Sequence, residues 1–160
     1  MIAITQFQSE YTQDVIDLVL HFQNDGTRPA VTVDEQPDLL NIKDSYIAMG
    51  GNFRIARDNN KLIGSIGLMP CGDGIGVLKK FFVNESYQGE PYNIGRKLYA
   101  RLLSFAMEKK YKTIMLDTLY NTVRAHKFYE KAGFKRIEEK ELPVTCSHPY
   151  RDCDFFLLNL

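Results

Sequence analysis

The apolar residues of this chain follow a helical period in four stretches. The first begins after Ser9 or Thr12 and ends at Asp25-Gly26, and the second begins at Pro37, a residue that suits a first helical turn. The third has its apolar residues on one stripe, and the fourth is closed by Gly133, the usual left-handed residue after a helix. Helical spacing therefore predicts helices at 12–24, 37–46, 94–108 and 122–132.

Seven further short segments are typical of strands. Asp58-Asn59-Asn60 separates two of them, which indicates a β-hairpin. The segments are 2–7, 53–56, 62–68, 77–83, 113–117, 134–137 and 154–160. Because a helix connects the fourth segment to the fifth, we expect these two strands to pair in parallel. This order of elements predicts an α/β (α+β) fold in which helices cover two faces of a sheet.

The composition is that of an ordinary globular domain. The chain has 160 residues, of which 44% are hydrophobic and 25% charged, so we expect a single domain over 1–160. Twenty basic residues balance twenty acidic ones, and this balance argues against a general nucleic-acid binder. The charge is uneven along the chain, however, with a net −5 over 1–78 and +5 over 79–112.

The sequence also predicts the cellular compartment of the protein. The first residues lack the basic start and apolar stretch of a secretory signal, and the longest apolar runs are too short for a membrane helix. The chain has three cysteines, which suits a reducing compartment better than a disulfide framework. We therefore expect a cytoplasmic protein, monomeric or homodimeric, with no membrane or nucleic-acid partner.

The join between the fourth strand and the third helix is the strongest candidate for a ligand site. It contains Gly89 and Gly95, and it leads from a strand into the first turn of a long helix. Backbone N–H groups and the positive end of the helix dipole favour a phosphate at such a place. Gly95 would allow a pyrophosphate to approach closely, and Asn93 suits a helix cap or a left-handed backbone. The alternative is an ordinary loop with a helix cap.

Two motifs carry a resemblance to a known family. The segments 78–83, 87–89 and 93–98 together resemble the acetyl-coenzyme A (acetyl-CoA) loop of the GNAT superfamily of N-acyltransferases. About forty residues later, 125–134 is similar to the second motif of that superfamily, a helix that ends in Tyr-Glu-Lys-x-Gly-Phe. The resemblance covers essentially the whole chain. It implies a mixed, mostly antiparallel seven-stranded sheet flanked by four helices, with a splayed fourth and fifth strand pair.

The chain departs from the family pattern within both motifs. Two extra residues separate Gln88-Gly89 from Ile94-Gly95, Pro91 lacks an N–H, and Asn93 stands where glycine is common. Thr122, preceded by Asn121, occupies a position where the family often has asparagine, and either residue could cap the helix.

The resemblance implies transfer of an acetyl group from acetyl-CoA to a small-molecule or peptide amine by direct attack, without a metal. The backbone N–H of Val83 would stabilise the oxyanion, and Tyr129 would donate a proton to the departing thiolate. Arg96 and Lys97 would add charge near the pyrophosphate, and the pantetheine arm would pair with the strand edge at Phe82 and Val83. The implied cofactor-binding residues are Phe82, Val83, Gln88, Gly89, Asn93, Ile94, Gly95, Arg96 and Thr122.

The base that removes a proton from the amine stays unassigned. Family members often carry a glutamate at the start of the fourth strand, where this chain has Val77. Glu85, Asp117 and His148 are alternatives, and so is a chain of water molecules.

Other readings of the sequence remain open beside this one. A metal site or a Cys–His nucleophile would need Cys146, His148 and Cys153. The spacing of these residues is not a standard zinc pattern. The loop 143–150 would instead close over the acceptor site. A non-catalytic module that binds coenzyme A or a protein is the competing function. The acidic first half, expected to receive the acceptor, favours a cationic amine.

Overall fold

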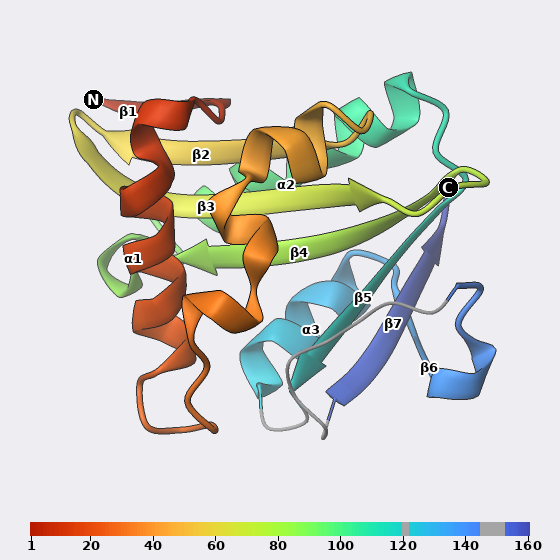
Figure 1. The fold of residues 1–160 in the computed structure, drawn as a ribbon. Coiled ribbons are helices and arrows are strands. Elements are labelled where there is room, and N and C mark those ends of the chain that lie inside the picture. Colours follow the sequence, from red (N-terminus) through yellow and green to blue (C-terminus); the bar gives the residue numbers. More distant parts are fainter. Residues whose placement is uncertain (120–121, 145–152) are drawn as a thin grey trace.

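The computed structural model describes residues 1–119, 122–144 and 153–160. Within these residues, seven strands form one sheet in the order β1-β2-β3-β4-β5-β7-β6 (Figure 1). Neighbouring strands are antiparallel except β4 and β5, which run parallel as expected from the helix between them. The strands are β1 (Ile2–Gln6), β2 (Asn52–Asp58), β3 (Lys61–Pro70), β4 (Ile75–Val83), β5 (Thr113–Leu119), β6 (Lys135–Ile137) and β7 (Cys153–Asn159).

Helices cover both faces of this sheet. Helix α1 (Thr12–Gln23) and the segment 33–47 lie over one face of β2–β4, and α2 (Ile94–Glu108) lies over the other (Figure 1). The apolar stripe of α2 is fully buried at Ile94, Leu98 and Leu102, and a second core lies under α1. Helix α3 (Val123–Lys131) follows β5 and buries Tyr129. The expected α/β (α+β) class is therefore confirmed.

The second expected helix differs from a regular α-helix. Residues Pro37–Leu40 form a 3₁₀ turn and Lys43–Ile47 a π-helical turn, separated by Asn41 with φ −140°. Both turns bury apolar side chains at Leu39 and Tyr46, which are 0% exposed. The apolar face predicted from the spacing is thus kept, while the backbone hydrogen bonding changes to fit the sheet beneath it.

Strands β4 and β5 pair only where they begin. Their pairing runs from Ile75–Val77 to Thr113–Met115, after which the two strands diverge (Figure 1). The edge of β4 that faces β5 is therefore unpaired from about Leu78 onwards. This splayed pair, which the family resemblance implied, leaves the end of β4 without a strand beside it on this edge.

A bulge interrupts β4 just before its end. Lys79 lies opposite Gly67 and Phe82 opposite Ser65, so two residues of β4 face one residue of β3. Lys80, within the bulge, has a left-handed backbone with φ 56°, and its carbonyl accepts a hydrogen bond from Ser65 Oγ at 2.7 Å. The bulge redirects the side chains on this part of β4.

Candidate active site

A cavity of about 810 Å³ lies at the splay between β4 and β5. Its lining comes from the end of α1, the last half of β4, the following loop, the first turn of α2, the end of β5 and α3. This volume is within the usual range of small-molecule sites. Nine of the ten residues expected at the site line it, namely Phe82, Val83, Gln88, Gly89, Asn93, Gly95, Arg96, Thr122 and Tyr129.

The side chain of the tenth residue, Ile94, lies in the core and not in the cavity lining. Its side chain is 0% exposed and packs in the core under α2, and it does not line the cavity. As the first residue of α2, however, it has a backbone N–H with no partner within the helix. Ile94 can therefore offer a ligand its N–H group alone.

The backbone of Val83 faces the open side of β4. Asn84 N donates to Ile63 O at 2.7 Å, which makes this pair a hydrogen-bonded one across β3 and β4. The adjacent pair, Val83 with Gly64, is then non-hydrogen-bonded, so the Val83 N–H and C=O point away from β3. Gln88 Nε2 donates to the Val83 carbonyl at 2.8 Å. An N–H suited to an oxyanion thus lies on the unpaired edge, and the Gln88 side chain orients the peptide beside it.

The first turn of α2 presents free N–H groups to the cavity. Asn93 precedes the helix in the left-handed conformation (φ 51°, ψ 41°) and makes no side-chain cap, so its left-handed backbone is the alternative that holds. Gly95 and Arg96 line the cavity within the first turn, where helix N–H groups lack intrahelical partners. A Cβ added at Gly95 would lie 3.7 Å or more from its neighbours, so its approach is open.

Tyr129 is buried at the cavity wall. Its side chain contacts the rings of Phe81, Phe134 and Phe156, and its hydroxyl bonds to no other described residue. Burial raises the pKa of Tyr129 well above its usual value of 10, and the Asp117 carboxylate raises it further. The phenol therefore stays protonated at neutral pH and can act as a proton donor.

The alternative bases lie in different places. Glu85 is at the surface, where its carboxylate, 60% exposed, bonds to His21 Nε2 at 2.8 Å and does not line the cavity. Asp117 lines the cavity from β5 and acts electrostatically on Tyr129 and Lys80. His148 lies outside the described residues, as does most of the loop 143–150.

Of the two candidate helix caps, Thr122 takes the N-cap position of α3 without a side-chain cap. Thr122 does precede α3, but its hydroxyl hydrogen-bonds to Leu119 O at 2.6 Å and to Thr118 Oγ1 at 2.7 Å, and it does not cap the helix. The hydroxyl instead closes the turn that follows β5. Asn121, the other candidate cap, lies outside the described residues.

Sequence reasoning missed four cations in the cavity lining, one of which is Lys79 on β4. Arg28 lies in the loop after α1, Lys80 in the β4 bulge, and Arg124 in the first turn of α3, within 3.7 Å of a Cβ built at Gly89. Lys80 belongs to the first motif, but the sequence does not show that its side chain is directed toward the cavity. The bulge that sets this direction has no clear mark in a single sequence.

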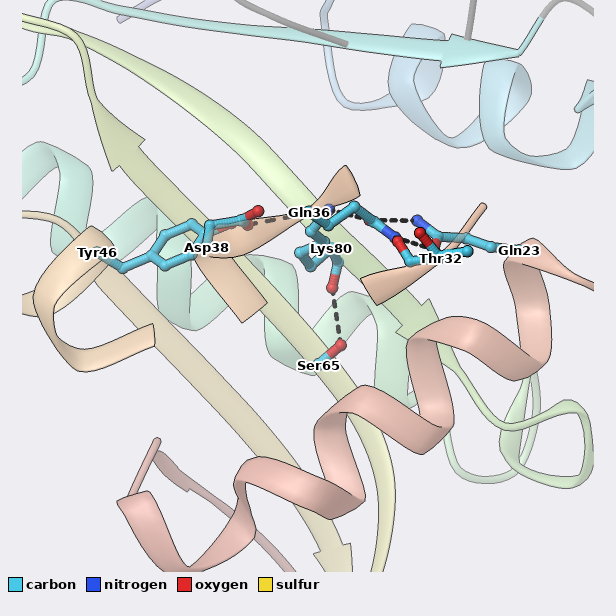
Figure 2. Close-up of polar contacts among 7 residues, drawn as sticks. All are labelled: Gln23, Thr32, Gln36, Asp38, Tyr46, Ser65 and Lys80. Atoms are coloured by element: carbon cyan, nitrogen blue, oxygen red, sulfur yellow. Dashed lines mark hydrogen bonds and ion pairs between the residues drawn. The ribbon is translucent and has the colours of Figure 1, made fainter. Parts of the chain in front are cut away.

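Lys80 is a buried ammonium with polar neighbours. Its side chain is 7% exposed; Nζ donates to Gln36 Oε1 and lies 3.9 Å from Asp38 Oδ2 (Figure 2). Burial lowers the pKa of Lys80 from 10.5 to about 8, against the opposing effect of Asp38. Lys79 lowers it further, and Asp117 raises it.

This pKa predicts a pH-dependent stability. The folded chain releases the Lys80 proton near pH 8 and the unfolded chain near 10.5, so stability rises with pH between these values. Relative to Lys80→Met, the wild type should gain about 1–2 kcal/mol in unfolding free energy from pH 7 to 9.5. Urea unfolding of both proteins at the two pH values measures this difference. An unchanged difference would show that Lys80 has an ordinary pKa.

The described residues show neither a cluster of metal-binding side chains nor a helix that could span a membrane. Within residues 1–119, 122–144 and 153–160 no group of three or more His, Cys, Asp or Glu side chains is placed to hold a metal ion. Cys146 and His148, which the alternative metal site or Cys–His pair would need, lie outside those ranges. Among the described helices, none is both long and apolar enough to cross a membrane.

Comparison with known proteins identifies the family. The model of the acetyltransferase (GNAT) family matches residues 16–134, which include both motifs. The chain belongs to the GNAT family. This GNAT chain is 30% identical over 117 residues to a probable N-acetyltransferase, camello, of Xenopus tropicalis. The match covers 71% of the chain but only 52% of that relative, so the chain spans about half of its length.

Solved structures share the whole GNAT fold seen here. An acetyltransferase from Streptococcus agalactiae is 36% identical, with a TM-score of 0.94 over 99% of this chain and 98% of that one. A chain from Salmonella typhimurium, solved with its cofactor acetyl-CoA, is 16% identical, with a TM-score of 0.73 over 99% and 93% of the two chains. The second likeness is one of fold alone.

Proposed function

We propose that residues 1–160 act as one domain that transfers the acetyl group of acetyl-CoA directly to a primary amine. The observation that carries this proposal is the cavity at the splayed strands. It joins the unpaired edge of β4, the N–H groups of the first turn of α2 and the side chain of the buried Tyr129. Acetyl-CoA bound in the GNAT-fold structure from Salmonella typhimurium supports the same ligand class.

The cofactor would lie along the lining residues in order. The N–H groups of Ile94, Gly95 and Arg96 would bind the pyrophosphate, with charge from Arg96 and Arg124. The pantetheine amides would pair with the unpaired edge of β4 near Phe82 and Val83, much as a peptide adds to a sheet edge. This arrangement would bring the thioester carbonyl to the Val83 N–H.

The reaction then needs no covalent intermediate on the protein. The amine nitrogen attacks the thioester carbonyl carbon, a C–N bond forms, and the oxyanion accepts a hydrogen bond from the Val83 N–H. The C–S bond breaks, and the departing thiolate takes a proton from the Tyr129 hydroxyl. The attacking nitrogen releases one proton to solvent and the Tyr129 phenolate takes one back from solvent, so the amine has lost one proton, the thiolate has gained one, and the Tyr129 hydroxyl is restored.

A screen for acetyl acceptors tests the proposed function. Thiol release from acetyl-CoA is followed with amino acids, polyamines and peptides, and acetyl-CoA binding is measured by calorimetry in parallel. Release that requires both the protein and an amine supports acetyl transfer. Binding of acetyl-CoA without release by any amine would overturn it in favour of a non-catalytic coenzyme A-binding module.

A further inference from the structure

The part of the cavity under α1 is lined by polar and cationic side chains. Gln23, Arg28 and Lys80 line it together with the stacked rings of Phe22 and Phe82, whose centroids lie 5.5 Å apart. The acidic lining residues, Glu90 and Asp117, come from the phosphate loop and from β5. If acetyl-CoA lies along β4 and the start of α2, as proposed above, this α1 side of the cavity is left for the acceptor.

The β4 bulge brings Lys80 to this side at an energetic cost. A left-handed conformation is strained for a residue with a Cβ, and Lys80 adopts it with φ 56°. Strained backbone of this kind persists where surrounding structure enforces it, often at functional sites. Ser65, itself 0% exposed, enforces it here through its hydrogen bond to the Lys80 carbonyl (Figure 2).

A buried polar network positions the Lys80 ammonium but does not use all of its hydrogen-bond donors. The amides of Gln23 and Gln36 donate to each other at 2.8 and 2.6 Å, and Gln36 Oε1 also accepts from Lys80 (Figure 2). Asp38 Oδ2 accepts a 2.5 Å hydrogen bond from the Tyr46 hydroxyl and is 3.9 Å from Nζ, too far for a hydrogen bond to it. An ammonium has three donors, so Lys80 keeps donors for a ligand.

Arg28 supplies a second cation whose hydrogen bonding is incomplete. It lines the same cavity, and its Nε is buried without a partner among the described residues. The charge of Arg28 has a smaller effect on the pKa of Asp25 than the hydrogen bonds from Thr27, which lower that pKa most. A guanidinium also has four terminal N–H donors, and these bind the two oxygens of a carboxylate in pairs.

We propose that the acceptor is a small amino-acid-like compound, whose amine is acetylated and whose carboxylate is bound by Lys80 and Arg28. This inference rests on the proposed function. Lys80 and Arg28 both line this cavity, and two cations would match the two oxygens of a carboxylate. The lowered pKa of Lys80 agrees with this role, because a bound anion would offset the cost of burying the charge.

The inference differs from the expectation of a cationic amine. That expectation came from the acidic excess over residues 1–78, yet the cavity residues from this half of the chain are Phe22, Gln23, Arg28 and Leu78, none of them acidic. Asp38, which faces Lys80, does not line the cavity. The acidic residues of the first half therefore do not set the charge that an acceptor meets.

Matched acceptors test the inference. Each pair is an amino acid and its carboxamide, such as leucine and leucinamide, and kcat/KM is calculated per unprotonated amine for both. The wild type should prefer the free carboxylate by about tenfold or more. Lys80→Gly, which also suits the left-handed backbone, and Arg28→Ala should each reduce this preference about tenfold, mainly through KM, while acetyl-CoA affinity is kept.

Lys43→Gly serves as the control, because Lys43 is exposed and lies outside the cavity lining. Thermal unfolding shows whether each variant is folded, and Lys80→Gln, which also removes the charge, is the second variant if Lys80→Gly is not. Equal efficiency with the amino acids and the amides would overturn this inference while leaving the proposed function intact. Acetyl-CoA binding without transfer to any amine would overturn both.

Discussion

Tyr129→Phe is expected to lower kcat for acetyl transfer by about 10²- to 10⁴-fold, the usual contribution of a general acid. Only the hydroxyl is removed, and the ring contacts with Phe81, Phe134 and Phe156 stay in place. The hydroxyl bonds to no other described residue, so its loss should leave the fold and acetyl-CoA affinity unchanged. Steady-state kinetics and calorimetry with acetyl-CoA measure the two quantities.

Tyr99→Phe provides a matched control for this experiment. Tyr99 is 8% exposed, close to the 7% of Tyr129, and burial raises its pKa to about 12. Its hydroxyl is buried without a partner among the described residues, but Tyr99 does not line the cavity. Kinetics of Tyr99→Phe should match the wild type. A Tyr129→Phe variant with wild-type kcat would remove Tyr129 as the acid.

Gly95→Val is expected to weaken acetyl-CoA binding about tenfold to hundredfold, or about 1.4–2.8 kcal/mol. The new Cβ would be in ordinary contact with Phe81 and Val83, at 3.7 and 3.9 Å, so the fold should accept it. The side chain would lie in the first turn of α2, where the proposed pyrophosphate site needs close approach to backbone N–H groups. Calorimetry with acetyl-CoA gives the dissociation constant directly.

Ser104→Val controls for the placement of a β-branched residue in the same helix. Ser104 is on the exposed side of α2 and does not line the cavity. Acetyl-CoA affinity of Ser104→Val should equal that of the wild type. If Gly95→Val also keeps wild-type affinity, the phosphate site is not at the first turn of α2.

The sequence predicts most of the fold because its main signals are local. Apolar spacing placed α1, α2 and α3 and the strands to within a few residues, and the helix between β4 and β5 indicated their parallel pairing. The segment 37–47 was harder to predict, since its buried residues keep a helical spacing while its hydrogen bonds follow two other periods. The period of apolar residues indicates which side chains are buried. It says less about which backbone N–H and C=O groups form hydrogen bonds with each other.

The site was predictable where a motif coincides with a structural element. Nine of the expected residues line the cavity because they belong to the end of β4, the loop after it, the first turn of α2, or α3 with the residue before it. Arg28 was missed because it reaches the cavity from a loop without a motif, and Lys80 because a one-residue bulge determines its direction. The network of Gln23, Gln36 and Asp38 depends on contacts between distant segments, which a single sequence does not reveal.

The most direct test of acetyl transfer follows the acetyl group itself. The protein is incubated with acetyl-CoA that carries a deuterated acetyl group and with a pool of amino acids and other amines, and products and intact protein are analysed by mass spectrometry. The account predicts the label on the nitrogen of an amine, dependent on the protein, with no label on the protein itself. Label found only in acetate, retained in acetyl-CoA, or attached to the protein during turnover would contradict it.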